Sequence, residues 1–247
     1  MAQNIYDNQE FFNEYSKLAR SKKGLPGAPE WPFLQAMIKD IRDLTVLDLG
    51  CGFGWFCRWA KQAGAARVHG IDISQNMLSR ALAAGPDPAI TYEAGDLEQV
   101  NLPIESFHIV YSSLTIHYLE DPRRLFSQVY RTLIPQGRFV FSVEHPIFTA
   151  PTHPTWKKNA DGQVFWPLDA YSQEGLRTTD WLAKGVRKYH TTLETYISLL
   201  LDAGFILKSI KEWMPSDKDL RDHPEWADER HRPAFLLVAA QKVNSAE

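Results

Sequence analysis

The sequence predicts an α/β fold in which helices cover both faces of a mainly parallel sheet. From Thr45 onward, short apolar segments of strand composition alternate with helical patterns, as they do in a doubly wound sheet. The first segment ends in a run of glycines, a common junction between a buried strand and a ligand-binding helix. The 247 residues, 44% hydrophobic and 23% charged, are typical of a globular protein, and we expect a single domain over residues 1–247.

Seven segments are expected to form strands, because each is a short run of aliphatic, aromatic and β-branched residues. They are TVLDLG (45–50), ARVHGID (66–72), AITYEAG (89–95), FHIVYSS (107–113), GRFVFSVE (137–144), FILKSI (205–210) and AFLLVAAQ (234–241).

Three helices can be placed between these strands. Apolar side chains recur at helical spacing after the first strand and predict a crossover helix with Trp55, Phe56, Trp59, Ala60 and Ala63 inward. Asp121 and Pro122 are a typical cap and first-turn pair for a helix that buries Leu125, Phe126, Val129 and Leu133. Thr191 and Glu194 have capping-box spacing and predict the start of a helix that Gly204 ends.

Two segments break the alternation. Residues 1–43 suggest two helices around the turn KKGLPGAPEWP (22–32), with Phe11, Phe12, Tyr15 and Leu18 on the first. Residues 146–190 are rich in Pro and Trp and have no clear period. Their aromatic residues argue against disorder and favour a substrate-covering insertion, with a purely structural flap as the alternative.

Composition and charge narrow the functional classes. A net charge of −3 without a long Lys/Arg block gives no footprint for nucleic acid, so a small ligand is expected. No run approaches the roughly 18 apolar residues of a membrane helix, and the start MAQNIYDNQE does not resemble a signal peptide, which predicts a cytoplasmic protein. Cys51 and Cys57 are interpreted as small core residues, and the eight histidines show no metal-ligand spacing.

The glycine turn, VLDLGCGFGW (46–55), indicates which nucleotide could bind. The dinucleotide pattern G-x-G-x-x-G counted from Gly50 would place its third glycine at position 55, which is Trp55. The turn instead has Gly50, Gly52 and Gly54, with Asp48 at the end of the strand before it. A carboxylate there would repel a pyrophosphate and suit an ammonium group. S-adenosylmethionine has an adenosine, an ammonium and a sulfonium but no phosphate, so Asp48 favours it over a dinucleotide.

Two further carboxylates follow the next strands. Asp72 ends the second strand, where a carboxylate can accept both ribose hydroxyls. Asp96 ends the third and could accept the adenine amine while Leu97 packs on the ring. Each could be an ordinary loop acid. Together with Asp48 they predict one ligand site at the carboxyl edge of the sheet.

The same segments resemble the class I S-adenosylmethionine-dependent methyltransferases, in the small-molecule, type 11-like branch. VLDLGCGFG, GIDIS, GDLE, FHIVYSSLTIHYLED and LIPQGRFVFS are similar to successive motifs of that family, and the resemblance covers nearly the whole chain. The flanking segments FFNEYSKLARSKKGLPGAPEWP and DWLAKGVRKYHTT also resemble a group of bacterial members of unknown substrate.

The resemblance implies a Rossmann-like, seven-stranded sheet whose last strand, Ala234 to Gln241, is antiparallel, with an insertion after strand five. Residues 1–43 would form a helical cap, 44–145 the cofactor-binding core, 146–190 the insertion and 191–247 the last helix and strands. The cofactor would contact Gly50, Gly52, Asp72, Ile73, Met77, Asp96, Leu97 and Ser112. Tyr15 and Arg20 on the leading helices become candidates for its carboxylate; a solvated helix end is the alternative for Arg20.

Methyl transfer from a sulfonium is an in-line displacement in which positioning supplies much of the catalysis, and a base is needed only for a nucleophile that keeps its proton. His117 is the first candidate, because that position in related enzymes lies near the methyl. Glu144 and His145, after the fifth strand, are the second. A hydrogen-bonded structural histidine is the alternative for both His117 and His145.

The acceptor is expected to be a small molecule. The segment after strand four reads YSSL where methylases acting on nucleic-acid bases have [DN]-P-P-[YF], and no metal is implied. Trp55, Trp181 and Tyr189 could stack on a planar acceptor, or simply close the core. A weaker resemblance to toxoflavin-type N-methyltransferases suggests an aza-heterocycle. Other chemistry on S-adenosylmethionine, a non-catalytic binding protein and a dinucleotide oxidoreductase stay open, as do monomer and homodimer.

Overall fold

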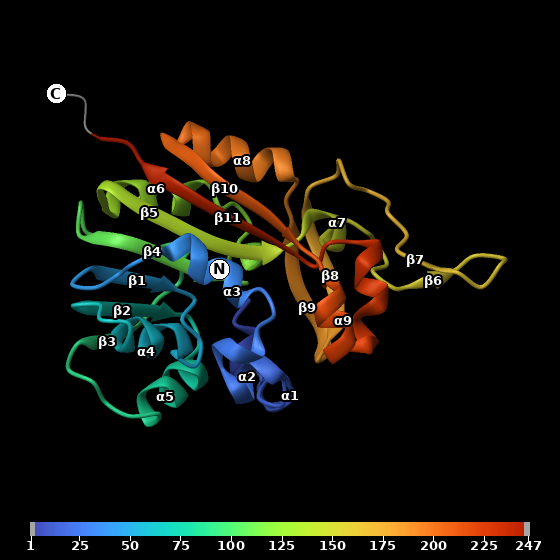
Figure 1. Ribbon diagram of the computed structural model, residues 1–247, viewed down its shortest axis with the longest axis horizontal. Coiled ribbons are helices and arrows are strands. Elements are labelled where there is room, and N and C mark those ends of the chain that lie inside the picture. The colour runs from blue at the N-terminus through green and yellow to red at the C-terminus, as the bar shows by residue number, and fades with distance from the viewer. Residues whose placement is uncertain (1–2, 245–247) are drawn as a thin grey trace.

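A seven-stranded sheet forms the centre of the computed structural model, which describes residues 3–244 (Figure 1). Residues 1–2 and 245–247, at the two ends of the predicted cap and C-terminal segment, lie outside the described residues. The strands are β1 (Thr45–Leu49), β2 (Arg67–Asp72), β3 (Ile90–Ala94), β4 (Phe107–Ser113), β5 (Leu133–Glu144), β10 (Phe205–Trp213) and β11 (Phe235–Lys242). Their order is β10-β11-β5-β4-β1-β2-β3, and β11 runs antiparallel to both neighbours. The predicted fold class is confirmed.

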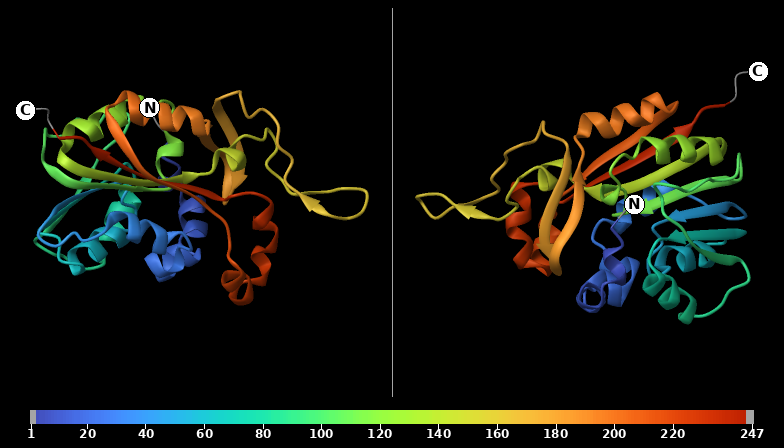
Figure 2. Two further views of the ribbon diagram at one scale, coloured as in Figure 1. Left: turned by 45° about the horizontal axis from the view of Figure 1, so that its top comes forward. Right: turned by 180° about the vertical axis from the view of Figure 1, so that it is seen from behind.

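Helices cover both faces of the sheet, as the views in Figures 1 and 2 show. One face packs on α3 (Trp31–Ile38), α4 (Trp55–Gln62) and α5 (Gln75–Ala83), and the other on α6 (Arg123–Thr132) and α8 (Leu193–Asp202). Alternate strand residues divide between the two cores: Leu47 and Phe141 face α6 and α8, whereas Val46 and Val140 face α3 and α4. Burial on both faces explains why the central strands β1, β4, β5 and β11 are largely apolar, whereas the outer strands β3 and β10 carry exposed polar residues.

The helix starts show where local sequence determines structure. Helix α6 begins one residue later than its predicted cap and first-turn pair implies: Pro122, not Asp121, is the N-cap residue, and it has no side-chain cap hydrogen bond. Asp121 still accepts a hydrogen bond from the backbone N–H of Arg123 (2.9 Å) at the start of the helix. The predicted capping box of α8 is wrong by one residue. The hydroxyl of Thr192, not Thr191, accepts from the N–H of Thr195 (3.2 Å), and the Glu174 carboxylate accepts from both the N–H and the hydroxyl of Thr192 (2.7 Å each). Glu174, 18 residues away in the chain, thus favours Thr192 over Thr191 as the capping residue of α8.

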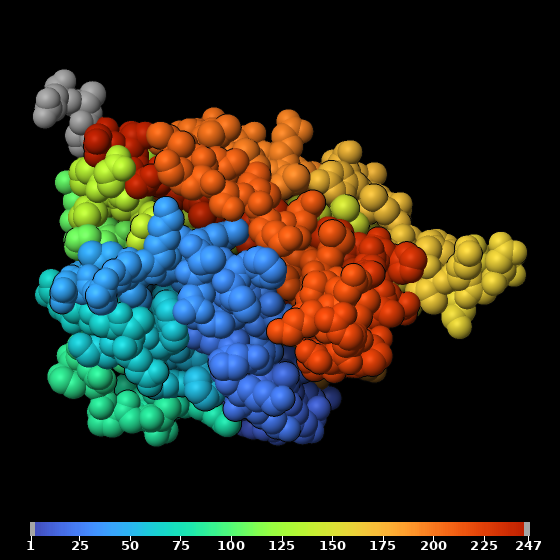
Figure 3. All heavy atoms as spheres, in the orientation of Figure 1, coloured from blue at the N-terminus to red at the C-terminus, as the bar shows by residue number. Residues whose placement is uncertain are grey.

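The segment 146–190 is more regular than its sequence suggests. After α7 (Pro146–Thr149) it forms two antiparallel hairpins, β6 (Lys157–Lys158) with β7 (Val164–Phe165) and β8 (Gly175–Trp181) with β9 (Ala183–His190). The β8 residues alternate between half-buried and exposed, but threonines and Arg177 occupy several positions, so no apolar period is visible. The β6–β7 hairpin projects away from the rest of the molecule (Figures 1 and 3).

The N-terminal segment lies between α5 and the β8–β9 hairpin. It consists of a 3₁₀ turn (Ile5–Asp7), α1 (Gln9–Tyr15), α2 (Ala19–Lys23), a second 3₁₀ turn (Leu25–Gly27) and α3. Leu18 is extended (ψ 153°) and divides the predicted first helix into α1 and α2. Asp7 accepts from Ser74 Oγ (2.6 Å) at the start of α5, and Gln3 donates to the Gly185 carbonyl (3.0 Å) at the start of β9. The segment thereby connects the sheet edge to the insertion.

The remaining helices, α9 (Asp217–Asp222) and a 3₁₀ helix (Pro224–His231), connect β10 to β11 beside the insertion. Among residues 3–244, no helix is both long and apolar enough to cross a membrane.

We predict that Thr192→Ala destabilises the protein by about 1 kcal/mol, the usual value of an N-cap, because the first turn of α8 loses a hydrogen-bond acceptor. Thermal or urea unfolding measures this change. Thr192→Ser keeps the hydroxyl and should stay within a few tenths of a kcal/mol of the wild type. Equal loss in the two variants would show that the methyl, not the cap, matters.

Candidate active site at the carboxyl edge of the sheet

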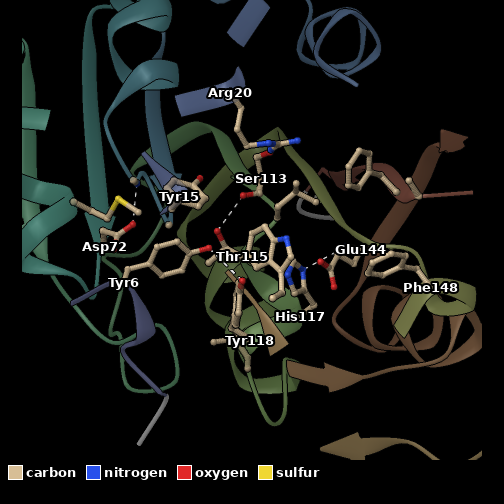
Figure 4. A pocket seen from close by; sticks show the side chains of 18 of the residues that line it. Tyr6, Tyr15, Arg20, Asp72, Ser113, Thr115, His117, Tyr118, Glu144 and Phe148 are labelled. Carbon is tan, nitrogen blue, oxygen red and sulfur yellow. Dashed lines mark hydrogen bonds between the residues drawn. The ribbon is translucent and has the colours of Figure 1, made fainter. Parts of the chain in front are cut away.

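A cavity of about 400 Å³ lies where β1, β2, β4 and β5 end. Its roof comes from the N-terminal segment, the β8–β9 hairpin and residues 213–235. Figure 4 shows Asp72 at one end of the cavity and Phe148 at the other, with Ser113, Thr115 and His117 between them. Strand ends distant in sequence thus meet at one elongated site, as the parallel topology requires.

Asp72 organises one end of this cavity. One carboxylate oxygen accepts from the N–H of Gly52 (2.8 Å) and the other from the N–H of Ser74 (2.9 Å). These two bonds connect the glycine turn after β1 to the start of α5. Burial raises the pKa of Asp72 to about 6 despite both bonds, because a carboxylate away from water is destabilised.

Two glycines of the turn, Gly50 and Gly52, differ in the space around the position of a Cβ atom. Gly50 has a φ of +77°, and a Cβ there would lie 2.1 Å from Thr115 Oγ1, so the turn has no room for a side chain. Gly52 has a φ of +52°, and nothing lies within 4 Å of the position that its Cβ would take. The backbone at Gly52 therefore borders open space, which is what a closely approaching ligand needs.

Twelve residues that the sequence proposes for the site line this cavity: Tyr15, Arg20, Gly50, Gly52, Asp72, Ile73, Met77, Asp96, Leu97, His117, Glu144 and Trp181. The Arg20 side chain is 23% exposed, so it is partly rather than fully solvated, and its guanidinium Nη2 pairs with buried Glu30 Oε1 at 3.0 Å. One oxygen of Asp96 accepts from the N–H of Glu98 (2.9 Å).

Five predicted residues do not line it. Two are the proposed stacking residues Trp55, which borders a smaller cavity beside the glycine turn, and Tyr189, which borders another cavity beside β9. Asp48 is buried behind the glycine turn and borders a smaller adjoining cavity; burial raises its pKa to about 7, and its partner is the Cys57 thiol (3.3 Å). Ser112 donates to the Leu49 carbonyl (2.8 Å), and its neighbour Ser113 lines the cavity instead. His145 has both ring nitrogens occupied, Nδ1 by the N–H of Ile147 (3.0 Å) and Nε2 by Glu212 (2.9 Å).

His117 lies in the middle of the cavity and is buried. Its Nδ1 accepts a hydrogen bond from the N–H of Glu144 (3.3 Å), a contact that requires the tautomer with the proton on Nε2. Burial is the largest of the effects that lower its pKa to about 4, so the ring is neutral near pH 7. This arrangement suits a hydrogen-bond donor better than the base that the sequence suggests.

The other end of the cavity has aromatic walls and paired charges. Its rings are Tyr118, Phe148, Trp181, Trp213, Trp226 and Phe235. Lys188 of β9 pairs with Glu144 at 2.5 Å, and Arg232 pairs with Glu229 at 2.9 Å. Sequence reasoning missed Lys188, Glu229 and Arg232, because only the fold brings β9 and the segment before β11 to this edge. The i,i+3 spacing of Glu229 and Arg232 is too common to single them out.

Comparison with known proteins identifies the family. Residues 47–141 match the family described as "Methyltransferase domain". An S-adenosylmethionine-dependent methyltransferase of Mesorhizobium loti, known from a crystal structure, is 52% identical, with a TM-score of 0.85 over 89% of this chain and 100% of that chain. The chain belongs to the S-adenosylmethionine-dependent methyltransferases. The enzyme class and family predicted from the sequence are confirmed.

Other relatives of this methyltransferase differ in how much they match. An uncharacterised protein of Haemophilus influenzae is 32% identical over 249 residues, which cover 97% of each chain. The malonyl-[acyl-carrier protein] O-methyltransferase of Hahella chejuensis is 33% identical over 98 residues, 39% of this chain and 35% of that protein. The matched stretch thus covers about a third of the length of the Hahella enzyme.

The family is named for its cofactor, S-adenosylmethionine, which leaves S-adenosylhomocysteine as the product. The residues of the cavity fit this group: Gly52 leaves its backbone open, and the Asp72 carboxylate ends its strand at the cavity wall. Among residues 3–244 no group of three His, Cys, Asp or Glu side chains could hold a metal ion.

We predict that Gly50→Ala destabilises this methyltransferase by about 2–5 kcal/mol, since the added methyl meets Thr115 and the backbone is left-handed. Gly52→Ala should cost only about 1–2 kcal/mol, the left-handed strain alone, yet weaken S-adenosylhomocysteine binding. Thermal unfolding and calorimetry measure the two effects. The opposite ranking of stabilities would contradict this account of the turn.

Proposed function

We propose that this enzyme transfers the methyl group of S-adenosylmethionine to an uncharged, planar small molecule by in-line displacement. The observation that carries the proposal is the division of one cavity into two ends. One end has open glycine backbone and strand-end carboxylates, whereas the other has aromatic walls and charges that are already paired.

At the cofactor end, Asp72 would accept the ribose hydroxyls and Asp96 the adenine amine, while Leu97 packs on the adenine ring. Ile73 and Met77 line the same end and would add apolar contact. Arg20 and Tyr15 would bind the methionine carboxylate, and the guanidinium of Arg20 is already held beside Glu30. Asp48 would act on the ammonium group from behind the turn, through its charge.

The acceptor end supports an uncharged, planar substrate. Glu144 and Lys188 neutralise each other, as do Glu229 and Arg232, and His117 is neutral near pH 7. A substrate with a net charge would therefore lose its hydration without gaining an unpaired partner. Aromatic walls bind planar rings well, because stacking adds to the burial of apolar surface.

The bound cofactor supplies an electrophilic methyl group on a sulfonium. The task of the protein is to hold the acceptor atom in line with it and to exclude water, and such positioning can account for several kcal/mol of the barrier. His117 would donate its Nε2 proton to the acceptor and so orient it.

The proposal is tested in two steps. Thermal unfolding is measured first with S-adenosylhomocysteine and with NADH, because a ligand that binds only the folded protein raises the Tm. S-adenosylhomocysteine formation is then assayed with neutral heteroaromatic compounds and, as matched controls, with charged analogues. A shift with NADH alone would exclude this reading. Cofactor binding without turnover on any acceptor would favour other chemistry or a binding protein.

We predict that Asp72→Ala weakens S-adenosylhomocysteine binding by about tenfold or more, because charge-assisted hydrogen bonds to the ribose are lost. Isothermal titration calorimetry gives the dissociation constant. Glu212→Gln, which changes a carboxylate outside the cavity, is the matched control and should bind like the wild type. An unchanged Kd for Asp72→Ala would contradict the ribose assignment.

We also predict that S-adenosylhomocysteine binds about tenfold more weakly at pH 5 than at pH 7.5. Burial raises the pKa of Asp72 to about 6, so the free carboxyl becomes protonated as the pH falls through that value. Ribose hydroxyls stabilise the ionised form, and affinity is therefore lost towards acid. Asp72→Asn should remove most of the dependence below pH 6. Asp48→Asn controls for the second buried carboxyl, whose pKa is about 7.

A further inference from the structure

His117 and Glu144 are adjacent polar groups of opposite hydrogen-bonding character on the acceptor side of the cavity. The Glu144 N–H donates to His117 Nδ1, so the two residues are in direct contact, and both line the cavity (Figure 4). With Nδ1 occupied, His117 can offer a ligand a donor, its Nε2–H, and Glu144 can offer an acceptor, its carboxylate. The two neighbouring residues thus combine one donor with one acceptor.

Lys188 holds the Glu144 carboxylate in its ionised form. Its ammonium is buried and pairs with Glu144 Oε1, while Oε2 is buried and receives no hydrogen bond from any of residues 3–244. Burial opposes ionisation of Glu144, but Lys188, His117 and Arg232 together hold its pKa below the usual range. A buried carboxylate oxygen without a donor is unusual. Because Glu144 lines the cavity, a small shift of its side chain would turn this oxygen towards a ligand that supplies the donor.

Rings restrict the shape of a group that could reach His117 and Glu144. The Tyr118 ring lies 4.6 Å from the His117 ring, and the Trp181 ring lies 4.6 Å from Lys188 Nζ. Phe148 and Trp181 line the same cavity wall as Glu144. The approach to the pair therefore favours a flat group that presents its own donor and acceptor side by side.

We propose that His117 and Glu144 bind the amide edge of a lactam-type heterocycle, and that Glu144 accepts the proton of the ring nitrogen that becomes methylated. The carbonyl oxygen of the lactam accepts from His117 Nε2–H, and its N–H donates to Glu144. This assignment rests on the proposed methyl transfer and specifies its substrate class and its base. Lys188 is a positioning residue, because it acts through Glu144.

The step balances in atoms and charge. The ring nitrogen gives its proton to the Glu144 carboxylate and forms a bond to the methyl carbon. The carbon–sulfur bond breaks, and its electron pair stays on sulfur. A neutral lactam, a carboxylate and a sulfonium become an N-methyl lactam, a carboxylic acid and a thioether.

The first test uses quinolin-2-one as the probe and N-methylquinolin-2-one, which lacks the N–H, as its matched control. Both are titrated into the protein saturated with S-adenosylhomocysteine. We expect quinolin-2-one to bind about tenfold more tightly, because only it donates to Glu144. Glu144→Gln and Lys188→Met should reduce this difference, while Glu212→Gln keeps it. Equal binding of the two probes to the wild-type protein would overturn the assignment.

The second test reads the His117 ring directly. Nitrogen-15 NMR of the wild-type protein with bound S-adenosylhomocysteine should show His117 protonated on Nε2 and not on Nδ1 between pH 5.5 and 8. A proton on Nδ1, or titration of the ring within that range, would overturn the donor role. Loss of S-adenosylhomocysteine binding itself would instead contradict the proposed function, so the two failures are distinguishable.

Discussion

The carboxylate of Asp72 is the contact on which the arrangement of the site depends. It accepts hydrogen bonds from the backbone of the glycine turn after β1 and from the backbone N–H of Ser74 at the start of α5. The hydroxyl of Ser74 donates to Asp7 of the N-terminal segment. One acid at a strand end thus sets the position of three segments. The raised pKa of Asp72 shows that its ionised form is destabilised by burial, because no opposite charge fully compensates the lost hydration.

The opposite end of the cavity is bordered by paired charges. Several ionised side chains border this end, and each is neutralised by an oppositely charged neighbour, in one pair from another segment and in the other from the same segment. Lys188 comes from the insertion and Glu144 from β5, while Arg232 and Glu229 precede β11. The Arg232 guanidinium also lies over the rings of Phe148 and Trp166, 4.3 Å from each centroid. The charges therefore bind the insertion to the sheet as well as shape the wall.

Much of this protein could be predicted from the sequence because its central strands, β1, β4, β5 and β11, are largely buried on both faces. Such strands are largely apolar, and the glycine that follows β1 and the acid that ends β2 take positions in the site that follow from parallel topology. The hairpin β8–β9 could not be predicted, since one face is polar and its alternation is masked by threonines and Arg177. The capping residue of α8 depended on Glu174, a contact that local sequence does not encode.

Within the site, the sequence predicted which residues line the cavity where the course of the backbone determines their position. It failed where contacts between side chains determine their orientation. The placement of Gly50, Gly52 and Asp72 follows from the strand ends. The orientation of each histidine depends on its hydrogen-bond partner. The Glu144 N–H occupies Nδ1 of His117, which lines the cavity, and Glu212 pairs with Nε2 of His145, which does not. The ion pair of Arg20 with the buried Glu30 likewise joins two helices whose packing no local pattern reveals.

The two ends of the cavity are encoded by different parts of the chain. Under the proposed function, the cofactor end uses residues up to Leu97, whereas most of the acceptor wall comes from residues between 117 and 235. Mutations in the second stretch can therefore change the recognised molecule while the first stretch stays intact. An evolving lineage could acquire new substrates by exchanging hairpins and the loop before β11, and the same division makes the insertion a natural module for recombination between relatives.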